Sequence, residues 1–356
     1  MTRHIVLLGV AALCACGLAL SLFPPRVSEV PATKVEDPRR VIIFPPVLSG
    51  YVSIDEGCDH IVGASVLGSE EETTHDPLFV ANPCLGQVPP MTTFPPGTTF
   101  PTDPEQVLLQ APDAVLLWPG TGDALEAAGA PVVHVRSLTP AGGAAESWGL
   151  LGRLAGKSPR AEALRRATEA GDASVLRAVD SFAGAKPTFL LMWSLDDPRT
   201  FYFGPPAWGP SLDLGSLNGI NLASAARRVG RADIEQLLLL DPDVIFLNRQ
   251  TPPLFYDQPV FSALKAVRER RVYRIPSFGG RLERLLPDHP VYLRWAAELL
   301  YPRQMARGTR DQLRETYRQY FNVQLDEAAL DRALFLDQNG SSAHYGRFRR
   351  SGDRTQ

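Results

Sequence analysis

Aromatic and cationic side chains gather after several apolar segments of this 356-residue sequence. Each segment can form a buried strand, and loops at the carboxyl ends of parallel strands line the ligand-binding edge of an α/β sheet. Rings and guanidinium groups at such an edge suit a large, partly apolar, anionic ligand such as a metal chelate. The candidate ligand-binding residues are Tyr51, Trp118, Trp193, Tyr202, Trp208, Arg249, Phe278 and Arg281.

Five of these residues also have a structural interpretation. Trp118 and Trp193 stand at strand ends, where burial in the core is an equal alternative. Tyr51 and Tyr202 can cover loops, and Arg281 can form a surface ion pair with an acidic neighbour. The set is therefore a hypothesis about a binding surface.

Catalytic and metal-binding patterns are weaker. Asp196 and Asp197 could act as acid and base, but an Asp-Asp-Pro sequence is also an ordinary turn, and no G-x-S-x-G motif is present. A zinc or manganese site built from His60, His134 and His289 is an alternative, although these histidines lack close ligand spacing. We expect a binding protein that is not an enzyme, with no catalytic residue, cofactor or bare metal site.

One segment occurs twice, first as Asp103–Leu117 and again as Asp233–Leu247. Both copies share Asp, Glu, Gln, two Leu, a Pro-Asp pair and a final Leu. Each copy predicts a short helix capped by its first Asp, a Pro-Asp turn, and a strand that is apolar on both faces. A repeated helix–strand unit predicts two similar α/β lobes with a ligand cleft between them.

The order of segments predicts an α/β fold in which two similar lobes with parallel-type sheets are joined by one long backbone helix. Such a helix is a stiff strut, so we expect little domain closure. The expected parts are a signal peptide or membrane anchor (1–25), a linker (26–39), an N-terminal lobe (40–142), the interlobe helix (143–185), a C-terminal lobe (186–302), a C-terminal helical extension (303–338) and a disordered tail (339–356).

The N-terminus predicts export. A short basic start precedes the apolar run Ile5–Leu22, as in a signal peptide, and the run is also near the lower limit for an uncleaved membrane anchor. The sequence Leu-Cys-Ala-Cys resembles a lipoprotein signal with Cys16 as the acylated residue, although Cys14 stands where a smaller residue is usual. We expect a protein of the periplasm or cell envelope, with membrane tethering as an open alternative.

Only Cys58 and Cys84 lie outside the N-terminal segment. In an oxidising compartment two such cysteines predict a disulfide, the alternative being two unrelated buried thiols. The bridge would fix the long segment after Gly68, part of a Thr- and Pro-rich insert, to the first lobe. The net charge of −3 gives no sign of a nucleic-acid partner.

With these features in place, the chain resembles the helical-backbone periplasmic binding proteins of ABC importers, over about residues 40–302. The resemblance is carried by Asp103–Trp118, Gly219–Ala223, Asp233–Leu247, Ala266–Pro276 and Arg294–Pro302. It implies capture of a small ligand outside the membrane and delivery to a permease with its ATPase.

The resemblance also implies a role for two carboxylates. One glutamate on each lobe of such proteins binds arginines of the permease, and the matching positions here are Glu105 and Glu235. The alternative is that each acid only complements a helix dipole, worth about 0.3–1 kcal/mol. We expect an iron chelate (ferric siderophore) as ligand; cobalamin or another corrinoid, haem and a molybdate-type oxyanion are the alternatives.

Overall fold

The computed structural model describes residues 38–44, 47–64, 75–91, 103–117, 122–135, 143–197, 200–204, 209–225, 231–248, 250–278 and 287–350. All of these residues belong to one compact unit. No helix in the described part of the chain has the length and hydrophobicity that a membrane span requires.

The first sheet has four parallel strands in the order β2-β1-β3-β4. Its strands are β1 (Val41–Ile43), β2 (Ile61–Ala64), β3 (Ala114–Leu117) and β4 (Val132–His134). Alternate residues of β1 and β3 belong to two separate hydrophobic clusters, as expected for strands that are covered on both faces. The helices of this lobe are α2 (Leu48–Asp55), α4 (Pro77–Ala81), α5 (Pro104–Leu109) and α6 (Asp123–Ala127), with the short helix η1 (Pro83–Gln87).

The second sheet repeats this order and adds two strands. The parallel set β7-β5-β9-β10 corresponds to β2-β1-β3-β4, and β6 and β8 extend it in antiparallel fashion. The strands are β5 (Thr188–Asp197), β6 (Thr200–Phe203), β7 (Ile220–Asn221), β8 (Arg231–Asp233), β9 (Val244–Leu247) and β10 (Val272–Arg274). Two of the candidate ligand-binding residues, Trp193 and Tyr202, belong to strands β5 and β6 and not to a loop after a strand, and Phe201 and Phe203 of β6 are buried.

Short helices cover this sheet on both faces. They are α9 (Gly209–Ser216), η2 (Leu222–Ala225), α10 (Ile234–Leu240), α11 (Pro253–Tyr256), η3 (Pro259–Phe261) and α12 (Lys265–Arg268). Leu237 of α10 and Phe255 of α11 pack on one face of β9, and Leu214 of α9 packs on the other. The same alternation of clusters along strands therefore builds both lobes.

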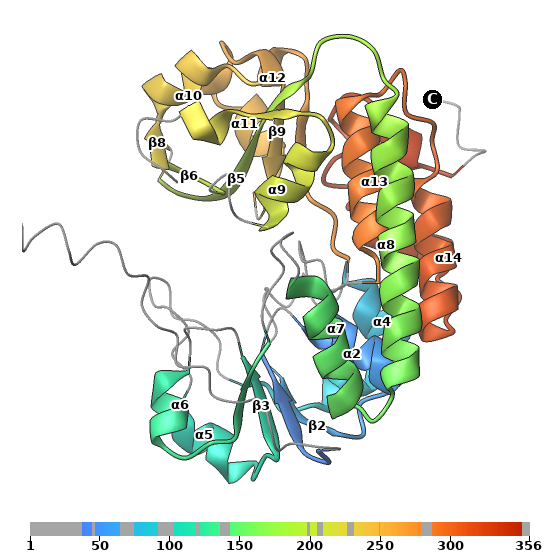
Figure 1. Ribbon diagram of the computed structural model, residues 1–356. Coiled ribbons are helices and arrows are strands. Elements are labelled where there is room, and N and C mark those ends of the chain that lie inside the picture. The colour runs from blue at the N-terminus through green and yellow to red at the C-terminus, as the bar shows by residue number, and fades with distance from the viewer. Residues whose placement is uncertain are drawn as a thin grey trace, which may run out of the picture. The chain divides into compact units, whose positions relative to one another are not determined.

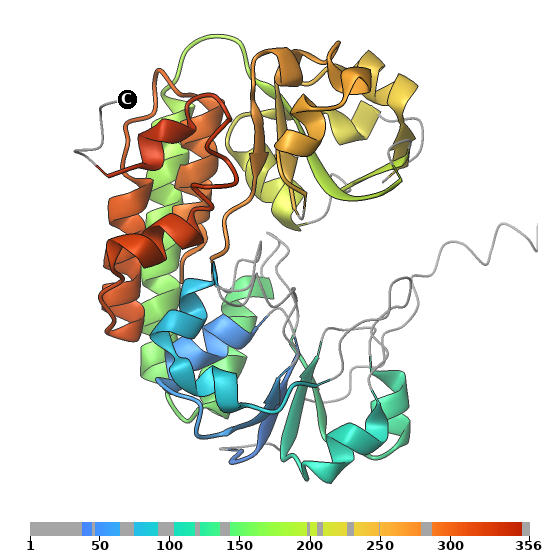
Figure 2. The same ribbon diagram turned by 180° about the vertical axis from the view of Figure 1, so that it is seen from behind.

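A long helix joins the two cores. Helix α7 (Gly143–Leu154) is followed by α8 (Ser158–Asp180), with a break near Gly156. Ala161 and Leu164, near the start of α8, belong to the first-lobe core, and Val175 and Val179, near its end, belong to the second. Figures 1 and 2 show α8 running beside α13 (His289–Leu300).

The C-terminal extension contains α14 (Thr309–Phe321) and α15 (Glu327–Ala333), followed by η4 (Tyr345–Phe348). The expectation that the chain is disordered from Asn339 onward is wrong for residues 339–350. Tyr345 and Phe348 are each 1% exposed, and Trp295 of α13 donates a hydrogen bond to the Tyr345 hydroxyl at 3.1 Å. The two buried rings anchor a segment that the sequence analysis assigned to a disordered tail.

The long segment between β2 and α5 also contains regular structure. Helices α4 and η1 occupy its described part, and the structure contains a disulfide between Cys58 and Cys84, with the Cα atoms 6.0 Å apart. Asp76 caps α4 by accepting a hydrogen bond from the Leu78 N–H at 2.9 Å. The disulfide links the chain just after α2 to η1, and it confirms the pairing of the two cysteines that the sequence predicts.

Candidate functional site

The repeated segment forms two matching helices, α5 in the first lobe and α10 in the second. Asp103 Oδ1 accepts a hydrogen bond from the Glu105 N–H at 2.9 Å, and Asp233 Oδ1 accepts one from the Gln236 N–H at 2.8 Å. Each aspartate therefore satisfies an N–H group that the first helical turn cannot. The caps fix where each helix begins and so where its first-turn side chains stand.

The Pro-Asp turn after each helix is tied to the neighbouring central strand. Asp113 accepts a hydrogen bond from the Arg39 N–H at 2.9 Å, and Asp243 accepts one from the Thr188 N–H at 2.8 Å. Burial alone would raise the pKa of Asp243, but an ion pair with Lys265 at 2.6 Å and the hydrogen bonds from Thr188 hold it below its usual value. Both helices are thus anchored at the same two points.

Glu105 and Glu235 occupy equivalent places. Each is the second residue of its helix, lies in the first turn and is exposed to solvent. Neither forms an ion pair with another described residue of the chain, so both carboxylates are available to an external cation. A carboxylate in the first turn is also stabilised by the helix dipole.

Two leucines near the end of each helix are exposed as well. Leu109 is 82% and Leu239 77% exposed, and the preceding Leu108 and Leu238 are 39% and 36% exposed. The buried, half-buried and exposed positions follow the same order along both helices. Exposed apolar side chains beside a charged group are typical of a protein interaction surface. The sequence signal for this feature was the conserved spacing of the leucines in the two copies.

Of the candidate ligand-binding residues whose side chains the structure describes, two are buried and one is half-buried. Tyr51 in α2 is fully buried in the first-lobe core, and Phe278 is 4% exposed in the second-lobe core. These two side chains pack in the protein interior, so they are unsuited to direct contact with a ligand. Tyr202 in β6 is half-buried. The other ligand candidates lie outside the described residues: Trp118, the side chain of Trp193, Trp208, Arg249 and Arg281. Cys16, the expected lipidation site, lies outside them as well.

The three histidines considered as metal ligands each lie beside different carboxylates. His60 Nδ1 is 3.0 Å from Asp55, and His134 Nε2 is 3.5 Å from Glu126. His289 is placed elsewhere, at the start of α13. The structure therefore does not bring these histidines together.

A buried charge cluster surrounds His289 and was missed by the sequence analysis. Its Nδ1 is 2.8 Å from Asp172 of α8 and its Nε2 is 3.2 Å from Asp213 of α9. Burial alone would lower the pKa of His289, but the two carboxylates raise it to about 10. The cluster joins three helices, and its members are too far apart in sequence for spacing to reveal them.

Comparisons with known proteins agree with this architecture. The family model described as periplasmic binding protein matches residues 64–277. A periplasmic solute binding protein from Veillonella parvula is 23% identical, covers 86% of this chain and 94% of its own, and has a TM-score of 0.70. No curated protein matches the chain.

Two further solved structures share the fold. Helicobacter pylori CeuE with Ni(II) bound is 16% identical, with 84% of this chain and 95% of that chain covered and a TM-score of 0.64. Haemophilus influenzae MolA bound to molybdate is 15% identical, with 82% and 96% covered and a TM-score of 0.63. The chain belongs to the periplasmic binding protein family, and it is an exported solute-binding protein of ABC import and not an enzyme.

Proposed function

We propose that this protein captures an iron chelate of the ferric siderophore type and delivers it to an ABC permease by docking through Glu105 and Glu235. The observation that carries the docking proposal is the duplicated helix. Both copies present an exposed first-turn glutamate and the same exposed leucines. A partner with two equivalent subunits would meet equivalent groups on the two lobes.

The leucines give this docking surface an apolar component. Leu109 and Leu239 would be covered by the permease, while each glutamate pairs with a cation at the same helix. Interfaces commonly combine a desolvated apolar centre with charged groups that set orientation. The proposed docking surface therefore consists of Glu105, Leu108 and Leu109 on one lobe, and of Glu235, Leu238 and Leu239 on the other.

The preference for an iron chelate rests on residue chemistry. Aromatic rings and arginines suit a large anionic chelate, and the remaining candidate contacts are Tyr202, Trp118, Trp193, Trp208, Arg249 and Arg281. A small oxyanion would need fewer rings and more backbone amides. The metal-containing ligands named for CeuE and MolA agree with a metal-bearing solute but not with one particular compound.

Tethering to the membrane is a separate part of the proposal. Acylation of Cys16 would hold the solute-binding unit near its permease, and a retained N-terminal anchor is the alternative. Mass spectrometry of the N-terminal peptide distinguishes the two. A diacylglyceryl group on Cys16 supports the first, and an intact N-terminus that begins at Met1 contradicts it.

The ligand class can be tested by titrating the purified chain while following tryptophan fluorescence. The probes are ferric catecholate and hydroxamate chelates, cobalamin, haemin and molybdate. We expect saturation by at least one ferric chelate with a Kd at or below about 1 μM. Saturation by cobalamin, haemin or molybdate alone would contradict the iron-chelate assignment and would select the alternative that bound.

A further inference from the structure

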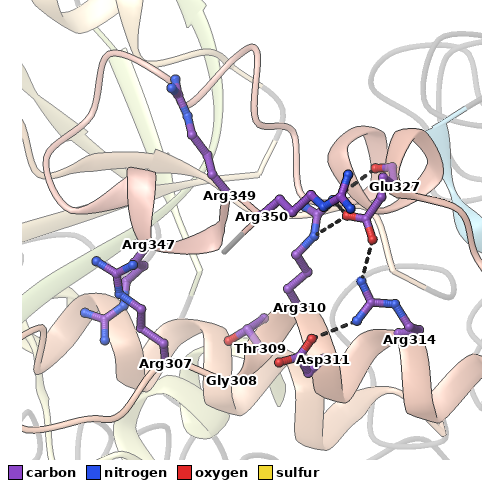
Figure 3. A pocket seen from close by; sticks show the side chains of 10 residues that line it. All are labelled: Arg307, Gly308, Thr309, Arg310, Asp311, Arg314, Glu327, Arg347, Arg349 and Arg350. Carbon is purple, nitrogen blue, oxygen red and sulfur yellow. Dashed lines mark hydrogen bonds and ion pairs between the residues drawn. The ribbon is translucent and has the colours of Figure 1, made fainter. Parts of the chain in front are cut away.

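A basic pocket lies in the C-terminal extension (Figure 3). Its volume is about 350 Å³. The wall is built from the start of α14, the first residue of α15 and the chain around η4, which are separate in sequence. The lining residues are Arg307, Gly308, Thr309, Arg310, Asp311, Arg314, Glu327, Arg347, Arg349 and Arg350.

The lining carries more positive than negative charge. It contains six arginines but only two carboxylates, Asp311 and Glu327. Glu327 is paired with Arg310 at 2.6 Å and with Arg314 at 2.8 Å, and the hydrogen bonds from Arg310 lower the pKa of Glu327. The acids of the pocket are therefore already occupied by two of the arginines (Figure 3).

A third arginine holds the pocket together. Arg347 donates hydrogen bonds to the buried Glu298 carboxylate at 2.8 Å and to the carbonyl oxygens of Pro302 and Met305 at 3.0 and 2.7 Å. Arg310 also donates to the Phe348 carbonyl at 3.2 Å. These contacts fix the chain around η4 against the start of α14 and give the pocket a defined wall.

Within the described part of the chain, the remaining arginines have no acidic partner. Arg307, Arg349 and Arg350 are exposed, and none of them forms an ion pair with another residue in the described ranges. Guanidinium groups match the oxygen geometry of phosphate groups, to which they donate paired hydrogen bonds.

The start of α14 is capped from within the protein. Thr309 is the first residue of this 13-residue helix, and the preceding Gly308 supplies no side-chain cap. The Glu298 carboxylate takes that place: it accepts hydrogen bonds from the Thr309 N–H at 2.9 Å and from the Thr309 hydroxyl at 2.8 Å. The first turn of α14 is therefore already capped by an acid, and the anion site proposed below does not depend on it.

We propose that this pocket binds a phosphate-class anion with two or more negative charges, supplied either by a free phosphate compound or by the headgroup of an anionic phospholipid. Arg307, Arg349 and Arg350 would contact the anion, while Arg310 and Arg347 hold the wall. The inference is independent of the ligand and docking proposals above, because it uses none of their residues.

The test uses the full chain and sodium pyrophosphate in a calorimetric titration. We expect saturable binding of one pyrophosphate per chain, weakened at least about tenfold in the variant Arg307→Gln/Arg349→Gln/Arg350→Gln. The control Arg153→Gln/Arg177→Gln/Arg332→Gln removes the same charge from exposed arginines elsewhere and should bind as the wild type does. Thermal unfolding of both variants checks that they remain folded.

Vesicles separate the two sources of the anion. Binding to phosphatidylcholine vesicles is compared with binding to vesicles that also contain phosphatidylglycerol. Vesicle binding that requires phosphatidylglycerol and is lost only in the pocket variant would identify the anion as a lipid headgroup. Pyrophosphate binding without such vesicle binding would identify it as a free phosphate compound. The proposal is overturned if the wild type shows neither interaction, or if the control variant loses as much as the pocket variant.

Discussion

Replacing Glu105 and Glu235 together by glutamine is expected to stop uptake and to leave ligand affinity unchanged. Both side chains are exposed first-turn residues of equivalent helices, so the change removes two available charges without disturbing a core. We expect uptake in cells to fall at least about tenfold, because orienting charge pairs at an interface are worth more than about 1.4 kcal/mol when desolvated. The helix-dipole loss should cost only about 0.3–1 kcal/mol of stability per site.

The matched control is Glu146→Gln/Glu269→Gln, which removes two exposed acids outside the repeated segments. It should transport like the wild type. Each single variant, Glu105→Gln or Glu235→Gln, should give an intermediate defect if both lobes dock. Two results would contradict the docking assignment: a loss of ligand affinity in the double variant, or normal uptake by cells that carry the double variant.

Replacing His289 by glutamine is expected to lower the free energy of unfolding by about 3–5 kcal/mol, because it leaves buried carboxylates without their cation. The side chain of Asp213 is 1% exposed and cannot exchange its partner for water. The comparison variant His134→Gln removes an imidazole that is 26% exposed and 3.5 Å from Glu126, and it should cost less than about 1 kcal/mol. Urea denaturation of both variants measures the difference.

The same cluster predicts a pH dependence. The pKa of His289 is raised from 6.5 to about 10 in the folded protein, so its contribution to stability is complete below about pH 6.5 and is lost as pH rises through 10. The stability difference between wild type and His289→Gln should therefore shrink between pH 7 and pH 10. A difference that stays constant over this range would show that the imidazole is not held in its charged form.

The pH range matters because Asp288 titrates nearby. Burial, together with the charge of Asp76, raises the pKa of Asp288 to about 7. Its contribution is present below the unfolded value of 3.8 and declines as pH rises through 7, the opposite of an ordinary surface carboxylate. Measuring the His289 effect above about pH 8, one unit beyond the pKa of Asp288, keeps the two titrations apart.

The sequence alone was sufficient to predict an element where one segment contained both the cap that starts a helix and the apolar pattern of a buried strand. The caps Asp103 and Asp233 and the strands β3 and β9 follow from the repeated segment alone, as does the exposure of Glu105 and Glu235. The break between α7 and α8 follows from the Gly-Lys-Ser-Pro sequence. These features depend on neighbouring residues, which a single sequence displays.

Features that depend on distant contacts could not be predicted in the same way. The order of residues 339–350 rests on the burial of Tyr345 and Phe348, on the hydrogen bond from Trp295 of α13 to Tyr345, and on the ion pair between Arg347 and Glu298. The burial of Tyr51 and Phe278 depends on which face of each lobe is covered by helices. A tyrosine or phenylalanine near a strand end has the same appearance in sequence whether it lines a core or a ligand surface.

The most direct test of the central claim is native mass spectrometry with metal analysis on the protein purified from the envelope of iron-limited cells. The account predicts one non-covalent ligand per chain, with iron in the complex and an unaltered compound on release. A metal-free ligand, or a compound that the protein converts into a product, would contradict it.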